Sequence, residues 1–388
     1  MTQPVVLVVG TRPEAIKLIP VYLALKAAGV PVLICATFQH AELLQQVFSI
    51  FNVFPDFNLA IMKKDQDLFY LTAAILEKMK AVYLETQPSL VLVHGDTTST
   101  FAAALGAFYL HIPVGHVEAG LRTGNMQAPF PEEMNRKVVG QIASYHFAPT
   151  AFSTAHLLAE GIDRTRIFCT GNTVVDALHM IQKKIGIGEL LIDPEVKQLV
   201  ESAKNSGKKI VLLTAHRRES FGGGLYRVFS AVKEFALAHP DVCIIYPMHP
   251  NPSVVCEFEA SGLGTVQNLC KMNSISYKEM VYLLTQVAFV VTDSGGIQEE
   301  AVSLGKQTIV LRDITERWEG VWDGSELLVG TNQEKIMNAM VQLYTQEPKE
   351  LGLSTVYGDG KACQRIVTII TKVLGICENS DSMSMHKK

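Results

Sequence analysis

The sequence predicts an α/β protein made of two Rossmann-like domains, each built around a parallel sheet. Apolar strand candidates alternate with helical stretches along the whole chain, which is the pattern of parallel strands joined by crossover helices. The 388 residues exceed the usual size of one hydrophobic core. A polar stretch punctuated by glycine and proline lies near the middle of the chain and divides the alternation into two halves.

Five strand candidates precede this stretch and five follow it. In chain order they are residues 5–9, 32–36, 90–93, 114–117, 145–147, 210–213, 242–246, 289–292, 308–311 and 326–329. The expected boundaries are 1–172 for the N-terminal domain, 173–208 for the linker region, 209–362 for the C-terminal domain, 363–377 for a C-terminal helix that packs back on the N-terminal domain, and 378–388 for a disordered tail.

The composition excludes several classes of partner. Hydrophobic residues make up 48% of the chain and charged residues 19%, which is typical of a well-buried globular protein. The net charge of −4 argues against an extended nucleic-acid surface. No apolar run reaches the length of a membrane span, and no signal-peptide pattern opens the sequence, so we expect no membrane partner. The seven cysteines are widely spaced and form no Cys-x-x-Cys pair, which argues against disulfides and structural zinc and favours a cytoplasmic location.

The segment 293–300, Asp-Ser-Gly-Gly-Ile-Gln-Glu-Glu, follows an apolar strand directly. Small residues that open a helix point unpaired backbone N–H groups at an anion, and Ser294 adds a hydroxyl donor. One turn later, Glu299 and Glu300 are placed to accept the two hydroxyls of a ribose. The segment is therefore either a site for a nucleoside diphosphate or an ordinary strand-to-helix turn with two solvated glutamates.

A second polar segment, 10–17, follows the first strand. Gly10 permits a tight turn, and Pro13 suits the first turn of a helix. Arg12 and Lys17 either grip a phosphate or are the exposed basic side chains of a capped helix. The segment is not a Gly-x-Gly-x-x-Gly fingerprint, which argues against a tightly bound NAD.

Three carboxylates follow strands or loops of the first half. Asp96 is either a catalytic or ligand carboxylate or a helix N-cap. Glu118 follows the next strand, and Glu132 opens a helix whose dipole it can complement. Because the ends of parallel strands meet at one edge, we expect all three in one cleft, where general acid–base chemistry on a non-acidic carbon explains their presence.

Histidines and arginines follow strands of the second half. His216 either acts on a phosphate or is a satisfied core histidine, and the neighbouring Arg217 and Arg218 favour the phosphate role. His249 lies in a proline-rich loop, which it either serves functionally or only stabilises.

Taken together and in this order, these motifs resemble the signatures of the non-hydrolysing UDP-N-acetylglucosamine 2-epimerases of bacterial type. The motifs are Gly10-Thr-Arg-Pro-Glu14, His94-Gly-Asp-Thr97, His116-Val-Glu-Ala-Gly-Leu-Arg122, Phe130-Pro-Glu-Glu-Met-Asn-Arg136, Thr214-Ala-His-Arg-Arg-Glu219 and Asp293-Ser-Gly-Gly-Ile-Gln-Glu-Glu300. The resemblance runs from about Val5 to the final helix. It implies a glycosyltransferase-B type fold whose two domains flank a cleft. It also implies reversible epimerisation of UDP-N-acetylglucosamine to UDP-N-acetylmannosamine without NAD or metal, for cell-surface polysaccharide.

The resemblance also implies roles for single residues. The family eliminates UDP anti across C1 and C2, leaves 2-acetamidoglucal, and adds UDP again after the proton returns to the other face. Asp96, Glu118 and Glu132 are the implied acid–base groups. His216 acts with them on the departing diphosphate. The implied substrate-binding residues are Arg12, Lys17, Ser294, Gly295, Gly296, Glu300, Met280 and Arg312.

A homodimer and an allosteric site for a second UDP-N-acetylglucosamine follow from the same resemblance. The positions that match the allosteric pattern are Gln39, His40, Gln66, Glu132, Arg217 and His249. Phe38 and Asp65 depart from this pattern. Met280 stands where the family often has an aromatic residue beside uracil, and Trp318 replaces a proline. Methionine can cover a base edge by dispersion, so we expect uracil binding to be kept.

Three other functions stay open. A hydrolysing relative would release N-acetylmannosamine and UDP. A retaining glycosyltransferase would need an acceptor site and has little use for three carboxylates. A non-catalytic UDP-sugar sensor would bind without chemistry, and the intact Asp96, Glu118 and Glu132 argue against it.

Overall fold

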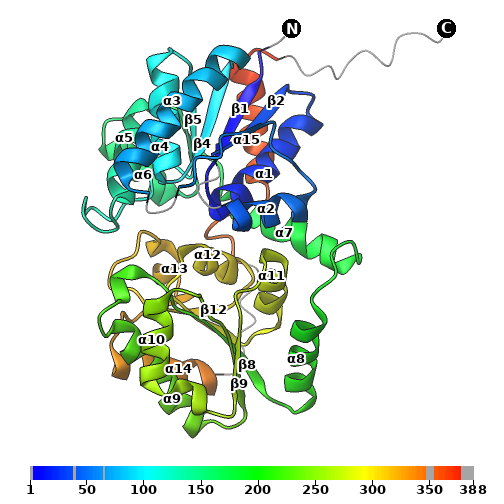
Figure 1. The fold of residues 1–388 in the computed structure, drawn as a ribbon, viewed down its shortest axis with the longest axis vertical. Coiled ribbons are helices and arrows are strands. Elements are labelled where there is room, and N and C mark those ends of the chain that lie inside the picture. Colours follow the sequence, from blue (N-terminus) through cyan, green and yellow to red (C-terminus); the bar gives the residue numbers. More distant parts are fainter. Residues whose placement is uncertain (1–2, 38–40, 64–65, 347–353, 377–388) are drawn as a thin grey trace, which may run out of the picture. The chain divides into compact units, whose positions relative to one another are not determined.

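The computed structural model describes residues 3–37, 41–63, 66–346 and 354–376. The chain divides into two compact units, one of Met1–Ala177 with Asp359–Lys388 and one of Leu178–Gly358. Each unit contains one parallel sheet with helices on both of its faces (Figure 1). The predicted α/β class with two parallel sheets is confirmed.

The sheet of the first unit has seven strands in the order β3-β2-β1-β4-β5-β6-β7, and every neighbouring pair is parallel. The strands are β1 (Val5–Val9), β2 (Val32–Ala36), β3 (Phe57–Asn58), β4 (Leu90–His94), β5 (Val114–Val117), β6 (Tyr145–Ala148) and β7 (Ile167–Cys169). The winding direction reverses between β1 and β4. Ligands of such sheets bind outside the carboxyl ends of the strands at this switch point.

The sheet of the second unit has six parallel strands in the order β10-β9-β8-β11-β12-β13. The strands are β8 (Lys209–Thr214), β9 (Val242–Pro247), β10 (Leu269–Met272), β11 (Phe289–Thr292), β12 (Gln307–Val310) and β13 (Glu326–Leu328). The winding reverses between β8 and β11, where Thr214 pairs with Thr292 in the last register position of both strands. The switch point therefore lies directly before the segment 293–300.

Three strands were missing from the sequence prediction, namely β3, β7 and β10. Each of them is an edge strand. Their residues are mostly half-buried or exposed, unlike the fully buried β1, β4 and β11. The apolar runs that identify central strands are therefore absent from these edges.

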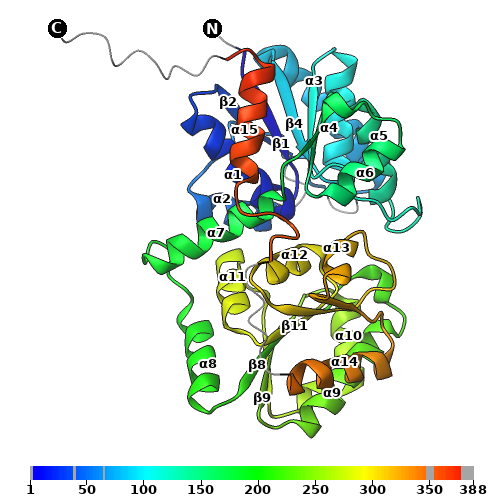
Figure 2. The ribbon, with the colours of Figure 1, turned by 180° about the vertical axis from the view of Figure 1, so that it is seen from behind.

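Helices of the first unit surround its sheet. They are α1 (Arg12–Ala27), α2 (Ala41–Phe51), α3 (Leu68–Thr86), α4 (Thr98–Tyr109), α5 (Glu132–Ile142), α6 (Ala151–Ala159), η1 (Arg164–Arg166), the start of α7 (Thr173–Gly186), and α15 (Ala362–Val373). The helices α3, α4 and α5 contribute to one apolar core with the strands. On another part of the unit α15 packs against α1 (Figure 2).

Helices of the second unit form two apolar cores on opposite faces of its sheet. They are α8 (Pro194–Asn205), η2 (Arg218–Ser220), α9 (Gly224–Ala238), α10 (Pro252–Ser261), η3 (Leu263–Thr265), α11 (Tyr277–Gln286), α12 (Gly295–Ser303), α13 (Trp318–Trp322) and α14 (Gln333–Thr345). One core contains α9, α10 and α14, and the other contains α8, α11 and α12. The stretch 173–208, expected as a linker, thus holds α7 and α8, and the expected tail 378–388 lies outside the described residues.

A carboxylate of the first unit caps the N-terminus of helix α15. Asp176 in α7 accepts hydrogen bonds from the backbone N–H groups of Ala362 at 3.1 Å and Cys363 at 2.9 Å. These donors belong to the first turn of α15, which has no intrahelical acceptors for them. Arg365 adds a bond to the carbonyl of Thr170 at 3.0 Å. The C-terminal helix is therefore attached to the first unit by polar contacts as well as by its apolar face.

We predict that Asp176→Ala lowers the free energy of unfolding by about 1–3 kcal/mol, because it leaves buried backbone donors without an acceptor. Urea unfolding followed by circular dichroism measures the change. Asp359→Ala is the matched control, since it removes the partly exposed ion pair with Arg365 at 2.7 Å and should cost at most about 1 kcal/mol. Equal losses in the two variants would contradict the assigned role of Asp176.

Candidate functional site

The carboxyl ends of β1 and β4 approach each other closely in the first unit. A Cβ atom at Gly10 would lie 2.2 Å from the hydroxyl oxygen of Ser99 and 2.8 Å from that of Thr37. Contacts this short force the backbone or its neighbours to move, so only glycine fits at position 10. The turn after β1 therefore passes directly against the first turn of α4.

Glu14 joins the two loops at this switch point. It is 2% exposed, and its Oε2 accepts from the backbone N–H groups of Gly10 at 2.9 Å and Thr11 at 2.6 Å. Its Oε1 accepts from the hydroxyls of Thr97 at 2.7 Å and Thr100 at 2.9 Å. The sequence prediction assigned Glu14 no role, although Thr11 followed three residues later by glutamate is the pattern of a capping box.

Glu118 follows β5 in an unusual backbone conformation. Its φ is 63°, a value uncommon for residues other than glycine. Its Oε2 forms an ion pair with Lys17 and lies 3.5 Å from Nε2 of His94 and 3.4 Å from Nδ2 of Asn172. Lys17 is 4% exposed, so the alternative of an exposed basic side chain is wrong for this residue. Strained backbone at such a position is typical of functional sites.

Asp96 contacts the helix α5. The N-cap of α4 is Thr97, whose side chain accepts from the backbone of Thr100, so the alternative of an Asp96 N-cap is wrong. Oδ2 of Asp96 accepts from Arg136 through Nε at 2.9 Å and through the terminal nitrogen Nη2 at 2.6 Å. Asn135 donates to the carbonyl of Asp96 at 2.8 Å. The carboxylate keeps 24% of its surface exposed and stays reachable from solvent.

Arg136 is held in turn by Glu133. This carboxylate is fully buried and accepts from Arg136 at 3.0 Å and from the backbone N–H groups of Thr123 and Gly124, both at 3.1 Å. Glu132 is the first residue of α5 and is half-buried. Asp96 thus contacts the helix that begins with Glu132. Glu118 lies near the residue before Asp96, because its Oε1 is 3.8 Å from the point that a Cβ at Gly95 would occupy.

His116 supports the turn before Asp96 from inside the sheet. Its Nε2 lies 2.8 Å from the carbonyl oxygen of Gly95, and the residue is fully buried. Burial lowers the pKa of His116 to about 3, against a weaker opposing effect of the bond to Gly95. The imidazole is therefore neutral at physiological pH and donates one N–H to the turn.

Asp293 joins two loops of the second unit as Glu14 does in the first. It is fully buried, and its Oδ2 accepts from the backbone N–H groups of His216 at 2.6 Å and Arg217 at 2.7 Å. Its Oδ1 lies 3.4 Å from Nδ1 of His216. The loops after β8 and β11 are thereby held together at the switch point. The sequence prediction contained no role for Asp293.

His216 lies at the surface of this switch point. Its side chain is 34% exposed, so the alternative of a core histidine is wrong. The ring stacks on His249, with ring centres 5.2 Å apart and planes 10° apart. The structure thus brings together two histidines for which the sequence predicted different sites.

The start of α12 has no side-chain cap. Ser294 is the N-cap residue, and its side chain makes no capping bond. A Cβ at Gly295 would lie 2.5 Å from the guanidinium of Arg317, whereas no heavy atom lies within 4 Å of the corresponding point at Gly296. Glu299 and Glu300 are 1% and 5% exposed, so the alternative of solvated glutamates is wrong.

Two arginines lie near this helix start. Arg317, which the sequence prediction missed, donates to Glu299 at 2.7 Å and also pairs with Glu316. Arg312 is 3% exposed and donates to Glu219 at 2.8 Å and to Glu316 at 3.0 Å. Of these two arginines, Arg317 is the one whose guanidinium lies against Gly295.

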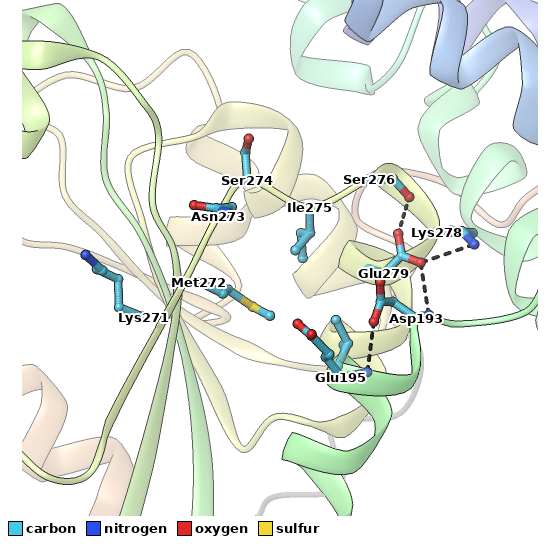
Figure 3. Close-up of a pocket in the computed structure, with 11 residues that line it drawn as sticks. Asp193, Glu195, Lys271, Met272, Asn273, Ser274, Ile275, Ser276, Lys278 and Glu279 are labelled. Atoms are coloured by element: carbon cyan, nitrogen blue, oxygen red, sulfur yellow. Dashed lines mark hydrogen bonds and ion pairs between the residues drawn. The ribbon is translucent and has the colours of Figure 1, made fainter.

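A hollow of about 620 Å³ lies at the carboxyl end of β10 (Figure 3). Glu279 accepts there from the hydroxyl of Ser276, from the backbone of Asp193 at 3.3 Å, and from Lys278 at 3.3 Å. None of the predicted site residues lines this hollow. Met280, the next residue of α11, is partly buried against the core formed by α8, α11 and α12.

The remaining predicted residues are scattered. Gln39 and His40 lie outside the described residues, as do Phe38 and Asp65. Gln66 in the first unit accepts from the backbone of Lys63 at 3.1 Å. Among the described side chains, no group of three or more His, Cys, Asp or Glu residues could hold a metal ion. No described helix has both the length and the apolar character needed to cross a bilayer.

Known proteins resemble this chain over nearly its whole length. A family profile described as UDP-N-acetylglucosamine 2-epimerase matches residues 24–371. A UDP-N-acetylglucosamine 2-epimerase of Yersinia pestis is 46% identical over 370 residues, which cover 94% of this chain and 97% of the relative. The crystal structure of a UDP-GlcNAc 2-epimerase from Neisseria meningitidis bound to UDP-GlcNAc matches with a TM-score of 0.89 at 41% identity, covering 95% of this chain and 100% of that one. A glycosyltransferase from Rickettsia africae, at 13% identity and a TM-score of 0.60 over 97% of this chain and 100% of its own, shares the fold alone.

The two sheets and their switch points define an enzyme of the glycosyltransferase-B fold type, as the resemblance implied. The chain belongs to the UDP-N-acetylglucosamine 2-epimerase family. The expectation of an isomerase of this family is thereby confirmed.

We predict that His116 makes the protein sensitive to acid. Its folded-state pKa of about 3 lies below the unfolded value near 6.5, so its contribution to stability is complete above pH 6.5 and is lost as the pH falls toward 3. His116→Gln keeps an N–H donor but does not titrate. Its free energy of unfolding should therefore fall less steeply from pH 6.5 to 4.5, by up to about 1.4 kcal/mol per pH unit.

Urea unfolding at a series of pH values measures this slope. His111→Gln at an exposed position is the control and should follow the wild-type slope. Parallel curves for wild type and His116→Gln would show that His116 does not titrate in this way.

Proposed function

We propose that this chain interconverts UDP-N-acetylglucosamine and UDP-N-acetylmannosamine by inverting the configuration at C2. The observation that carries the proposal is the concentration of ionisable groups at the switch point of the first sheet. Asp96 is held there by Arg136, and Glu118 by Lys17 and His94. Family membership supports the same reaction, because the Neisseria relative is described as an epimerase bound to UDP-GlcNAc.

The proposed reaction is an elimination followed by an addition. A base removes the C2 proton, the C2–H electron pair forms a double bond to C1, and the C1–O electron pair leaves with UDP. The product is 2-acetamidoglucal. UDP adds again at C1 while a second group returns a proton to the opposite face of C2. Two proton positions on opposite faces require at least two acid–base groups.

We assign the acid–base work to the carboxylates of the first unit. Glu118 is buried among groups that fix its position, which suits a base that must meet one particular C–H bond. Asp96 is more exposed and fixed by Arg136. Glu132, at the start of α5, completes the proposed set. Glu118 and Asp96 differ enough in burial and in hydrogen-bond partners to take different acid–base roles.

We assign the UDP group to the second unit. The backbone of Gly296, whose Cβ position is free of heavy atoms within 4 Å, and the guanidinium of Arg317 beside Gly295 are the proposed donors for a diphosphate. Ser294 supplies a hydroxyl, and the exposed His216 supplies a ring nitrogen that can stabilise the departing phosphate. Glu300 is assigned to the ribose hydroxyls. The family resemblance assigns Arg12 and Lys17 of the first unit to substrate binding as well.

Further parts of the proposal rest on the family resemblance alone. They are a homodimer, a cytoplasmic location, a role in supplying amino sugar for cell-surface polysaccharide, and a second UDP-N-acetylglucosamine that regulates the enzyme. His249 is the residue of the proposed regulatory set with the clearest link to the site, because its ring stacks on His216. A ligand that displaced His249 would change the surroundings of His216 directly.

We predict that incubation with UDP-N-acetylglucosamine in deuterated water yields UDP-N-acetylmannosamine that carries deuterium at C2. Proton and phosphorus NMR follow the configuration, the label and the phosphate groups together. Release of free N-acetylmannosamine with UDP would indicate a hydrolysing enzyme instead. Binding without exchange would indicate a sensor.

We predict that Glu118→Gln abolishes exchange of the C2 proton, with a loss of at least a hundredfold in rate, because general acid–base groups contribute about 10²–10⁴-fold. UDP binding, measured by calorimetry, should be retained, since Ser294, Gly296 and Arg317 of the second unit are unchanged in this variant. Glu85→Gln on the exposed face of α3 is the control and should exchange at the wild-type rate. Near-normal exchange in Glu118→Gln would remove Glu118 from this role.

A further inference from the structure

A second hollow in the Leu178–Gly358 unit is rich in lysine. It measures about 350 Å³ and lies at the amino ends of β8, β11 and β12. Lys204 reaches it from the last turn of α8, Lys208 and Lys209 from the start of β8, and Lys306 from the turn after α12. No carboxylate is among the described residues that line it.

Among the described residues, no carboxylate forms an ion pair with the lysines around this hollow. In the part of the chain that the structure describes, the lysines that form ion pairs are Lys17, Lys184, Lys197 and Lys278. Lys204 instead donates to the side-chain oxygen of Gln286. Lys209 donates to the carbonyl of Tyr344 at 2.7 Å and lies 4.7 Å from the centre of its ring.

Helix ends offer an alternative explanation for these lysines. Four helices, α8, α11, α12 and α14, end at or within two residues of the hollow. A helix C-terminus carries roughly −0.5 of an elementary charge, so four of them supply about −2. Four lysines supply twice that amount. Among the described residues, about two positive charges therefore stay uncompensated after the helix ends have been counted.

The lysines also repel one another. The pKa of Lys306 is lowered, first by burial and then by the charge of Lys204. A bound anion would relieve this repulsion. Amide groups are present as well, since Gln286, Gln307 and Gln346 line the same hollow.

We propose that this hollow binds an oxyanion of the phosphate class that carries at least two negative charges, held mainly by Lys204 and Lys306. Its volume lies at the lower end of the range of about 300–1,000 Å³ found for ligand sites, which is sufficient for a diphosphate. The site is distinct from the segment 293–300. It borders the amino end of β11, whereas that segment follows the carboxyl end of the same strand, about 13 Å away at about 3.3 Å per residue.

Titration calorimetry with inorganic pyrophosphate tests the proposal on the full-length protein at constant ionic strength and saturating UDP. We expect one bound equivalent. Lys306→Gln and Lys204→Gln should each raise the dissociation constant at least tenfold. Lys197→Gln is the matched control, because it lies earlier on α8 with a side chain 61% exposed, and it should leave the constant within twofold. No bound pyrophosphate, or binding insensitive to Lys204 and Lys306, would overturn the proposal.

A titration with ADP separates the two sources of such an anion. Binding of pyrophosphate but not ADP supports a free anion as the occupant. Binding of both, with the same dependence on Lys306, supports the diphosphate of a larger molecule whose remainder extends into solvent. Binding of ADP that is unchanged by Lys306→Gln counts against the site.

Thermal unfolding gives a readout that a purely structural role of the lysines would not produce. Pyrophosphate should raise the melting temperature of the wild type and of Lys197→Gln, but not that of Lys306→Gln. In buffer without phosphate, Lys306→Gln should melt at or above the wild-type temperature, because one repelling charge is gone. A lower melting temperature with no response to pyrophosphate in any variant would show that the lysines only compensate helix ends.

Discussion

The loop geometry at both switch points depends on one kind of interaction. At each switch point a buried carboxylate accepts hydrogen bonds from backbone N–H groups. Glu14 does this between the loops after β1 and β4, and Asp293 does it between the loops after β8 and β11. A buried carboxylate is stable only when its oxygens are satisfied, so each one imposes a fixed geometry on the segments that supply its donors. The same constraint positions the backbone of Thr11 beside one carboxylate and His216 beside the other.

A second layer of buried ion pairs orients the groups that the proposed function assigns to the substrate. Glu133 fixes Arg136, and Arg136 fixes Asp96. Glu299 fixes Arg317 beside Gly295. Buried ion pairs add little net stability, because desolvation offsets most of the attraction. Their effect here is on orientation, since a charged group with a buried partner has few alternative positions.

Central strands and the polar segments after them could be predicted from the sequence, because both leave local signals. Ten of the strands were predicted from largely apolar segments, and Asp96, Glu118 and His216 follow three of them within two residues. The edge strands β3, β7 and β10 carry no such run. Contacts between distant segments could not be predicted either. Arg136 lies 40 residues from Asp96, and His216 lies 77 residues from Asp293, so no local pattern shows either pairing. For the same reason the sequence does not show that Arg317 lies beside Gly295 or that four lysines line one hollow.

The attachment of α15 affects the order in which the two units complete their folding during translation. The first unit is assembled from both ends of the sequence, and α15 covers α1 only after Val373 has left the ribosome. Until then the part of α1 that receives α15 stays exposed, and Asp176 has no helix start to cap. The second unit is continuous and can close its own sheet earlier. The unit made first is therefore the unit completed last, and a nascent chain would expose its apolar surface for the whole time needed to translate the second unit.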